Sequence, residues 1–389
     1  MRLCVAGGCA YGSYAMCRAP VLPLLARSLG ARPELVGVVV GASTLTGVLL
    51  KLPAGALSDV LGRRALLLAG ALIFALLPFG YIAVGTLALV IALRVVHGGA
   101  TAIFGPVASA TLSDLAPAPE RGRWLGTYST AQGTGQALGP VLAGYLLARH
   151  GFPATFVVSG CAGVLALAVM STWPPDARQA PTGDRWRQLA QGVREVSHDH
   201  RTLTVSFAQA GQFVLNGSLN GFLPLFAVET LGLTAFQAGL AFGTQTLTTL
   251  LARPVFGIVS DRLGRRPLIL AGLACCGAAV WAVSLAEGMA SIAVACAAYG
   301  AGLAVTTSAT TAAITDLTKR IRYGAAHGVF GTIYDIGDAL GPIVAGAVVG
   351  TVGYRAMFRA AAITAIVTAL AFWRLSRNWG PVPNSATTG

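Results

Sequence analysis

Charged residues are scarce in this 389-residue chain, and their scarcity decides its class. They make up 11% of the residues, whereas an average soluble domain has about 25%. Hydrophobic residues make up 55%, and the mean hydropathy is +0.70. These values exclude an ordinary soluble domain and indicate a membrane protein.

Lysine is nearly absent, and the cysteines are not spaced as metal ligands or disulfide partners usually are. Lys51 and Lys319 are the only lysines, a bias that hints at a GC-rich bacterial genome. The seven cysteines show no spacing typical of metal ligands or disulfides. The adjacent His198, Asp199 and His200 could bind a metal, but a solvated loop explains them better because adjacent side chains diverge. We therefore predict no metal and no cofactor.

Long apolar runs are the main feature that the chain does have. Runs of about 20 residues, enough to cross about 30 Å of hydrocarbon as a helix, recur along almost its whole length. The N-terminal run resembles a secretory signal but continues past Arg18 without a convincing cleavage site, so we take it as a membrane span. We predict an all-α polytopic membrane protein with twelve spans, at residues 3–27, 35–57, 66–84, 87–114, 123–148, 154–173, 203–228, 236–257, 267–286, 290–315, 325–349 and 355–375.

The net charge of +13 reports orientation in the membrane rather than a nucleic-acid partner. If both termini are cytoplasmic, most of the 27 basic residues fall in the cytoplasmic loops and tail. Five remain on the opposite face: Arg27, Arg32, Arg149, Arg355 and Arg359. This asymmetry is the positive-inside pattern, so we expect a bacterial inner-membrane protein with both termini in the cytoplasm.

The chain contains an internal repeat at an offset of 202 residues. GALSDVLGRR begins at Gly55 and GIVSDRLGRR begins at Gly257. The same offset relates further pairs: Gly98 and Gly300, Asp114 and Asp316, Gly139 and Gly341, Pro140 and Pro342. Two parallel bundles with a site between them are typical of rocking transporters. We predict an N-terminal six-helix bundle at 1–175, a cytoplasmic linker at 176–201, a C-terminal bundle at 202–377 and a cytoplasmic tail at 378–389.

Several motifs lie in matching spans. The loop after the second span has Gly55, Asp59, Gly62, Arg63 and Arg64. The fourth span has Arg94, Gly98 and Ala102, with His97 where glutamine is usual, and the fifth has GQALGPVLAG at 135–144. On these motifs the chain resembles the major facilitator superfamily over essentially its whole length, and within it the 12-helix drug:proton antiporters. The resemblance implies two pseudo-symmetric six-helix bundles in a monomer that works by alternating access.

The two related loops are candidates for a conformational latch. In the superfamily the first aspartate is thought to hold the cytoplasmic side shut against the eleventh helix, which implies that role for Asp59 and the matching role for Asp261 against the fifth helix. A carboxylate at a helix N-terminus is worth about 0.3–2 kcal/mol, which is enough to bias two packed states. The arginines have the alternative interpretation of positive-inside charges. The latch set is Gly55, Asp59, Arg63, Arg64, Gly257, Asp261, Arg265 and Arg266.

Glycines in the fifth and eleventh spans are expected to allow close helix approach. They leave one helix side without bulk, and proline adds a bend by removing one backbone hydrogen bond. Simple helix packing explains this pattern, and antiport follows from the resemblance alone. The residues are Gly135, Gly139, Pro140 and Gly144, and then Gly341 and Pro342.

Polar side chains at helical spacing predict the walls of a cavity. Four amides of the seventh span are separated by 3, 4 and 4 residues and therefore share one face. In the superfamily, helices 1, 4, 7 and 10 surround the path. The predicted cavity set is Tyr11, Tyr14, Arg18, Arg94, His97, Gln132, Gln136, Gln209, Gln212, Asn216 and Asn220. For any single amide, joining helices together is the alternative. Lys51 and Arg253, near span ends, are interpreted as snorkelling to the interface.

Asp335 and Asp338 are the only carboxylates that we place deep in the membrane. They are three residues apart, hence on one helix face, and Asp335 lies about 15 Å into its span. Burial and mutual repulsion disfavour two ionised carboxylates there, so we hypothesise that the pair carries a coupled proton. The alternative is a permanent ion pair with Arg18 or Arg94. The N-terminal half has no embedded acid, unlike many drug antiporters.

The sequence thus predicts a secondary transporter that exports small organic or amphipathic compounds in exchange for protons. A transporter of an anionic metabolite that uses Arg18 and Arg94 is the alternative. An enzyme or a non-transporting receptor is disfavoured, because the chain shows no nucleophile, metal ligand set or phosphate loop. The expected partners are the substrate, protons and the lipid bilayer.

Overall fold

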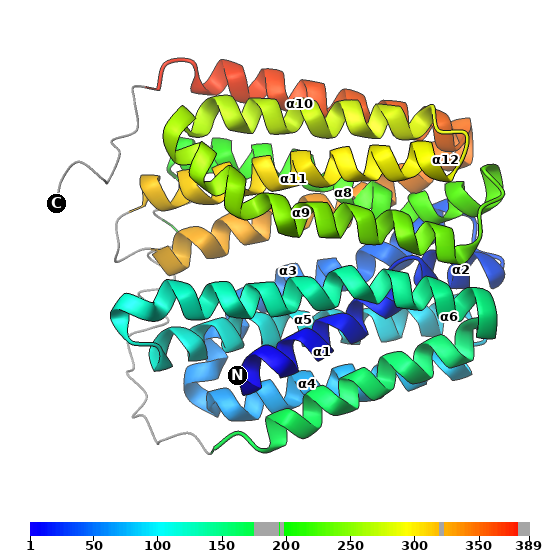
Figure 1. Ribbon diagram of the computed structural model, residues 1–389, viewed down its shortest axis with the longest axis horizontal. Coiled ribbons are helices and arrows are strands. Elements are labelled where there is room, and N and C mark those ends of the chain that lie inside the picture. Colours follow the sequence, from blue (N-terminus) through cyan, green and yellow to red (C-terminus); the bar gives the residue numbers. More distant parts are fainter. Residues whose placement is uncertain (175–193, 195–197, 319–322, 380–389) are drawn as a thin grey trace.

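The fold is two bundles of helices that lie side by side (Figure 1). The computed structural model describes residues 1–174, 194, 198–318 and 323–379, and it describes no side chains for 52–61, 118 and 323–325. The first half has α1 (Arg2–Arg18), α2 (Val21–Ser28), α3 (Pro33–Leu61), α4 (Arg63–Gly80), α5 (Leu87–Leu115) and α6 (Arg121–Ser171). The second half has α8 (His200–Leu225), α9 (Ala235–Leu263), α10 (Arg265–Ser284), α11 (Met289–Leu317) and α12 (Tyr323–Ser376).

Two of these helices each contain two membrane spans. Gly151 in α6 has φ 77° and Gly353 in α12 has φ 81°, a backbone conformation that glycine adopts without a side-chain penalty. The chain turns at these points, while α1 and α2 together form the first predicted span. Seven helices of the described residues are long and apolar enough to cross a membrane by length and composition, α6 and α12 among them. The prediction of an all-α fold with two matched six-helix bundles is confirmed.

The two ends of the molecule differ in their side chains. At one end, called here the arginine end, Gly62 and Gly264 with φ 85° and 87° join α3 to α4 and α9 to α10, directly before paired arginines. At the other end, called the glycine-turn end, lie the turns at Gly151 and Gly353. The arginine end is at the left of Figure 1.

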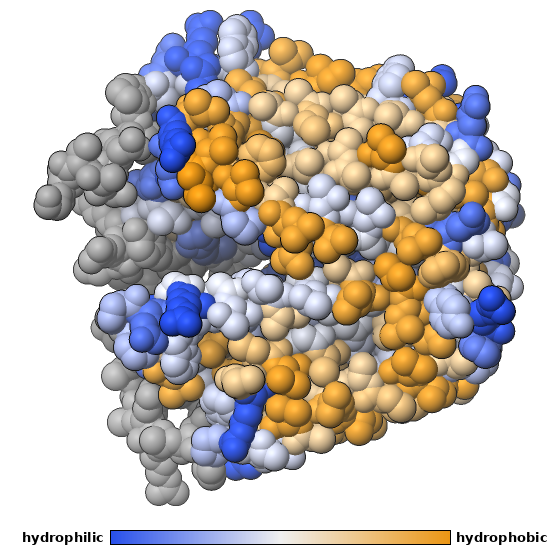
Figure 2. Space-filling model, in the orientation of Figure 1, coloured by the Kyte–Doolittle hydropathy of each residue, from blue (hydrophilic) through white to orange (hydrophobic). Residues whose placement is uncertain are grey.

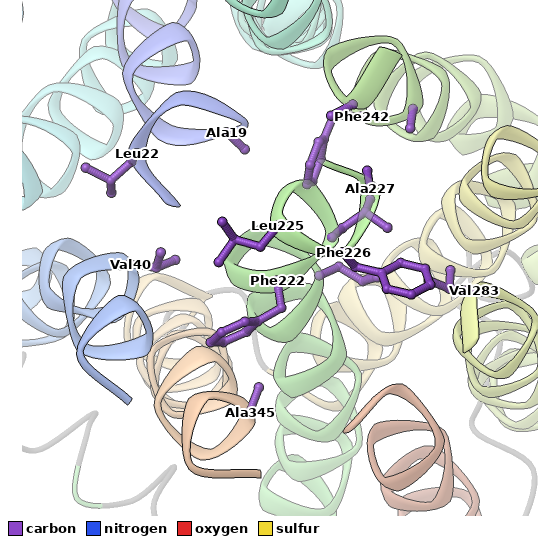
Figure 3. Close-up of a cluster of buried hydrophobic side chains, with 14 of the residues drawn as sticks. Ala19, Leu22, Val40, Phe222, Leu225, Phe226, Ala227, Phe242, Val283 and Ala345 are labelled. Carbon is purple, nitrogen blue, oxygen red and sulfur yellow. The ribbon is translucent and has the colours of Figure 1, made fainter. Parts of the chain in front are cut away.

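The apolar core is divided in a way that shows where the halves meet. One buried cluster lies wholly in the first half and another wholly in the second, both toward the arginine end. A third cluster, toward the glycine-turn end, has side chains from both halves. Figure 3 shows part of it, with Leu225 of α8 pointing toward Ala19, between α1 and α2, and Val40 of α3. The halves are therefore sealed together at the glycine-turn end.

Glycine makes the contact between the halves close. A Cβ at Gly37 of α3 would collide with the carbonyl oxygen of Pro342 in α12, and one at Gly239 of α9 with the carbonyl oxygen of Pro140 in α6. These two contacts are related by the repeat offset of 202 residues. A Cβ at Gly144 would lie 2.5 Å from the backbone oxygen of residue 235. The predicted packing motifs thus lie partly in two symmetric seams, α3 with α12 and α6 with α9.

Candidate functional site

A cavity of about 370 Å³ lies between the two halves. Figure 2 shows the surface hollowed between them toward the arginine end. Both halves supply its walls, and the predicted residues among them are Tyr11, Tyr14, Arg18, Gln136, Asn216, Asn220, Asp335 and Asp338. The structure therefore brings together the acidic pair and part of the predicted polar stripes.

Asp338 is held by three donors from three other helices. It accepts hydrogen bonds from Arg18 Nη2 of α1 at 2.6 Å, from Asn216 Nδ2 of α8 at 2.7 Å and from Thr44 Oγ1 of α3 at 3.3 Å. Its side chain is 6% exposed. A carboxylate that is buried this far needs such a set of donors in place of the water that it loses on burial. Asp338 is thus the better satisfied of the two acids.

Asp335 has a single partner among the described residues. It forms an ion pair with Lys51 of α3, whose ammonium also lies 5.8 Å from the centre of the Tyr334 ring. The interpretation of Lys51 as a snorkelling residue is wrong for this structure, because its side chain turns inward to a carboxylate on α12. The spacing of Lys51 from its span end gave no sign of this contact, which depends on how α3 and α12 pack.

Both ion pairs join the two halves of the molecule. Arg18 and Lys51 belong to α1 and α3 of the first half, whereas Asp335 and Asp338 belong to α12 of the second. The cations are 21% and 30% exposed, so water in the cavity reaches them. Any motion of one half against the other must therefore strain or break these pairs.

Arg94 and His97 do not reach the cavity. Both are fully buried inside the first half, where Arg94 donates to Ser43 Oγ and lies 5.5 Å from the centre of the Tyr14 ring. The His97 ring lies edge-on to Tyr14, with 4.9 Å between centres. The prediction that they line the cavity thus differs from the structure, because α5 turns this face into the interior of its own half. The alternative in which Arg94 forms an ion pair with the acidic pair is not realised, because Asp338 pairs with Arg18 and Asp335 with Lys51.

Three of the predicted amides also differ from expectation, since their hydrogen bonds go to other protein side chains instead of being free for a compound in the cavity. Gln209 and Gln212 are fully buried, and Gln212 Nε2 donates to the Tyr299 hydroxyl of α11 at 2.9 Å. Gln132 Nε2 donates to the Tyr128 hydroxyl at 3.1 Å. The spacing of 3, 4 and 4 residues places the four amides of α8 on one face. The part of that face with Gln209 and Gln212 packs against α11.

Several cavity residues were missed or misread from the sequence, and the repeat is the signal that could have found them. Thr44 and Thr246 are 202 residues apart, as are Lys51 and Arg253, and all four line the cavity. Gln245 also lines it. Extending the repeat from glycines to polar residues would have selected these positions.

Comparison with known proteins identifies the family. The family model of the Major Facilitator Superfamily matches residues 3–243 and 205–388. The chain belongs to the Major Facilitator Superfamily. An uncharacterized MFS-type transporter of Methanocaldococcus jannaschii is 24% identical over 369 residues, which cover 92% of this chain and 94% of that protein. The multi-drug resistance efflux pump PmrA of Streptococcus pneumoniae is 22% identical over 361 residues, which cover 88% of each chain.

The fold of a solved transporter agrees with this assignment. A bacterial homologue of the human lysosomal transporter Spinster, in an inward-facing and unoccupied conformation, superimposes with a TM-score of 0.83 at 15% sequence identity. The alignment covers 98% of both chains. This protein is therefore a multi-pass membrane transporter of the Major Facilitator Superfamily and not an enzyme.

The predicted latch residues of this transporter form contacts within each half. Arg265 binds Asp316 at 2.8 Å and Asp261 at 2.6 Å, all in the second half, and Arg63 binds Asp114 at 2.5 Å in the first. Among the described residues, Asp261 thus forms no ion pair or hydrogen bond with α6, and the cavity is hollowed at this same end. The side chains of residues 52–61, which include Gly55 and Asp59, lie outside the described residues. The latch remains a prediction.

An ion pair also joins the halves at the glycine-turn end. Arg27 Nε lies 2.8 Å from Glu229 Oε1, and the Tyr354 hydroxyl donates to the same carboxylate at 2.7 Å. Arg27 and Glu229 are 202 residues apart, so the pair joins equivalent positions across the pseudo-two-fold axis. The side chains of Arg27 and Glu229 are 46% and 30% exposed, so water reaches the pair.

This exposed pair is expected to contribute little to closure. Partly solvated ion pairs are worth about 0.2–1 kcal/mol, so Glu229→Gln should shift the equilibrium between open and closed glycine-turn ends by about fivefold at most. Distances between spin labels at the start of α3 and beside the turn at Gly353 in α12, both at the glycine-turn end, measure this shift at low and high salt. A larger shift that salt does not reduce would contradict the prediction.

Proposed function

We propose that this transporter exports small organic compounds across the bacterial inner membrane in exchange for protons, by alternating access, and that Asp335 binds the proton. The observation that carries the proposal is that both embedded carboxylates form ion pairs across the two halves. A proton on such a carboxylate removes a contact that holds one conformation together. Proton binding and movement of the halves are thereby linked.

The arrangement of donors supports separate roles for the two acids. Asp338, with three donors, fixes Arg18 and Asn216 around it. Asp335 has Lys51 as its one described partner, and protonation of Asp335 releases that lysine. The pair between α3 and α12 then opens, while the seam of glycines beside it is free to separate. Asp335 is therefore the better proton carrier.

The orientation of the molecule supports export. The positive-inside pattern favours a cytoplasmic arginine end, and in that orientation the cavity opens inward and can receive a compound from the cytoplasm. Asp261 of the predicted latch binds Arg265 of its own half, in keeping with an open arginine end. The similarity to the efflux pump PmrA favours the same direction.

The proposal is tested with purified protein in proteoliposomes that contain a pH-sensitive dye. A panel of amphipathic compounds is added while a pH gradient is imposed, and we expect compound movement in one direction to be matched by proton movement in the other. A protonophore is expected to abolish accumulation. Compound transport that ignores the pH gradient would overturn proton exchange, although not transport itself.

A further inference from the structure

The cavity carries one positive charge without a protein partner. Its walls include the cations Arg18, Lys51 and Arg253 and the carboxylates Asp335 and Asp338. Two of the cations are paired with the two carboxylates. Within the part of the chain that the structure describes, the guanidinium of Arg253 has no carboxylate within ion-pair distance. The cavity is therefore complementary to one negative charge.

The repeat explains why Arg253 is unpaired. Arg253 and Lys51 are equivalent positions, 202 residues apart, and the partner of Lys51 is Asp335. The position equivalent to Asp335 in the first half is Gly133, which lines the same cavity as Arg253. A Cβ at Gly133 would lie 2.8 Å from Leu250 Cδ1, one helical turn before Arg253 on α9. One wall thus holds a cation beside an acid, and the symmetric wall holds a cation beside a glycine.

The second ion pair of the cavity shows the same asymmetry. Arg18 and Asp338 are equivalent to Asn220 and Gln136, which are neutral amides that line the opposite wall. Neither amide has a hydrogen-bond partner among the described side chains. Gln245, also on this wall, is 5% exposed and its Oε1 is buried without a partner. Buried polar groups without partners are costly unless a ligand or water satisfies them.

We infer that the transported compound carries an acidic group, a carboxylate or a similar organic anion, which binds Arg253 in the space beside Gly133. The side-chain NH₂ groups of Gln136 and Asn220, which also line the cavity, donate hydrogen bonds to this group. The apolar body of the compound packs against aromatic side chains of the cavity, among them Phe213 and Phe242. In this arrangement the substrate anion completes, in one half, the ion pair that Asp335 completes in the other.

This inference rests on the proposed function of the cavity as the transport site, but not on the coupling ion. It is tested by binding to the purified protein, with three compounds of one shape: 1-naphthoate, the neutral 1-naphthamide and 1-naphthylmethylammonium. Isothermal titration calorimetry measures affinity, and ligand-induced thermal stabilisation provides a second readout. We expect 1-naphthoate to bind about tenfold more tightly than 1-naphthamide, and the ammonium compound to bind most weakly.

Two substitutions separate charge from shape. Arg253→Gln is expected to remove the preference for 1-naphthoate, and Arg253→Lys to keep part of it. Gly133→Asp supplies the missing carboxylate within the protein, so it should pair with Arg253 and weaken 1-naphthoate binding by about tenfold beyond Gly133→Asn, which adds similar bulk without charge. The flexible end of Leu250 can move to admit either side chain.

Two outcomes would overturn the inference: equal binding of the three compounds to the unmodified protein, or equal losses in Gly133→Asp and Gly133→Asn. Failure of proton exchange in proteoliposomes, with the naphthoate preference intact, would overturn the proposed coupling and leave the anion subsite standing. Proton exchange with a cationic compound, together with no preference for 1-naphthoate, would overturn the anion subsite and leave the proposed coupling standing.

Discussion

Asp335→Asn is expected to reduce proton-driven transport to the level of protein-free vesicles while preserving exchange of labelled for unlabelled compound. Asparagine keeps the size and a hydrogen-bond acceptor for Lys51 but cannot gain or lose a proton. The halves can still rearrange with compound bound, so exchange that needs no net proton movement continues. Transport driven by a pH gradient and counterflow without one, measured on the same vesicles, separate the two effects. Asp335→Glu should restore part of the proton-driven transport.

Asp338→Asn is expected to differ from Asp335→Asn, because its main effect is to lower the stability of the folded protein. It leaves Arg18, which is 21% exposed, without its carboxylate, and breaking a buried pair in this way costs about 3–5 kcal/mol. Partial solvation of Arg18 places the expected loss toward the lower end of that range. Thermal unfolding in detergent measures it. Full proton coupling in Asp335→Asn would remove Asp335 from the mechanism, whatever the result for Asp338.

Gly144→Ala is expected to shift the transporter away from the conformation described here. The added methyl group would lie 2.5 Å from the backbone oxygen of residue 235, and neither helix can yield without the seam between α6 and α9 opening. Overpacking costs about 1–3 kcal/mol, and because it acts on the sealed state alone the equilibrium should shift by about 5- to 150-fold. Spin-label distances across the glycine-turn end measure the shift.

Gly126→Ala is the matched control for this substitution. Gly126 lies on the same helix, α6, and an added Cβ there meets nothing within 4 Å among the described atoms. Alanine also has the higher helix propensity, so this control should be neutral or slightly stabilising. If both variants keep the same distance distribution as the unmodified protein, the seam does not set the equilibrium.

The internal repeat made most of the fold predictable. An offset of 202 residues, seen first in GALSDVLGRR and GIVSDRLGRR, fixed the two halves, and the structure extends it to atomic contacts such as Gly37 with Pro342 and Gly239 with Pro140. Helical periodicity also placed Asp335 and Asp338 on one face correctly, and the alternative of an Arg18 ion pair is realised for Asp338. Such features follow from the chain's own spacing.

The partners of the site residues were less predictable, because spacing shows which residues share a face but not what that face meets. Gln209 and Asn216 lie on one stripe of α8, yet Gln209 faces α11 and Asn216 faces the cavity. Arg94 was expected near the acids and instead lies among aromatic rings of its own half. The pairing of Lys51 with Asp335 depends on the rotation and crossing of α3 and α12, which only tertiary packing decides.

The apolar cluster shared by both halves at the glycine-turn end has a thermodynamic consequence for the transport cycle. Opening that end separates Leu225 from Ala19 and Val40, and hydration of the newly exposed apolar surface raises the heat capacity of the protein. The free energy of the conformational change should then vary with temperature along a curve, and cooling weakens the cohesion of the cluster. Membrane temperature therefore helps to set whether the empty transporter opens to one side of the bilayer or to the other.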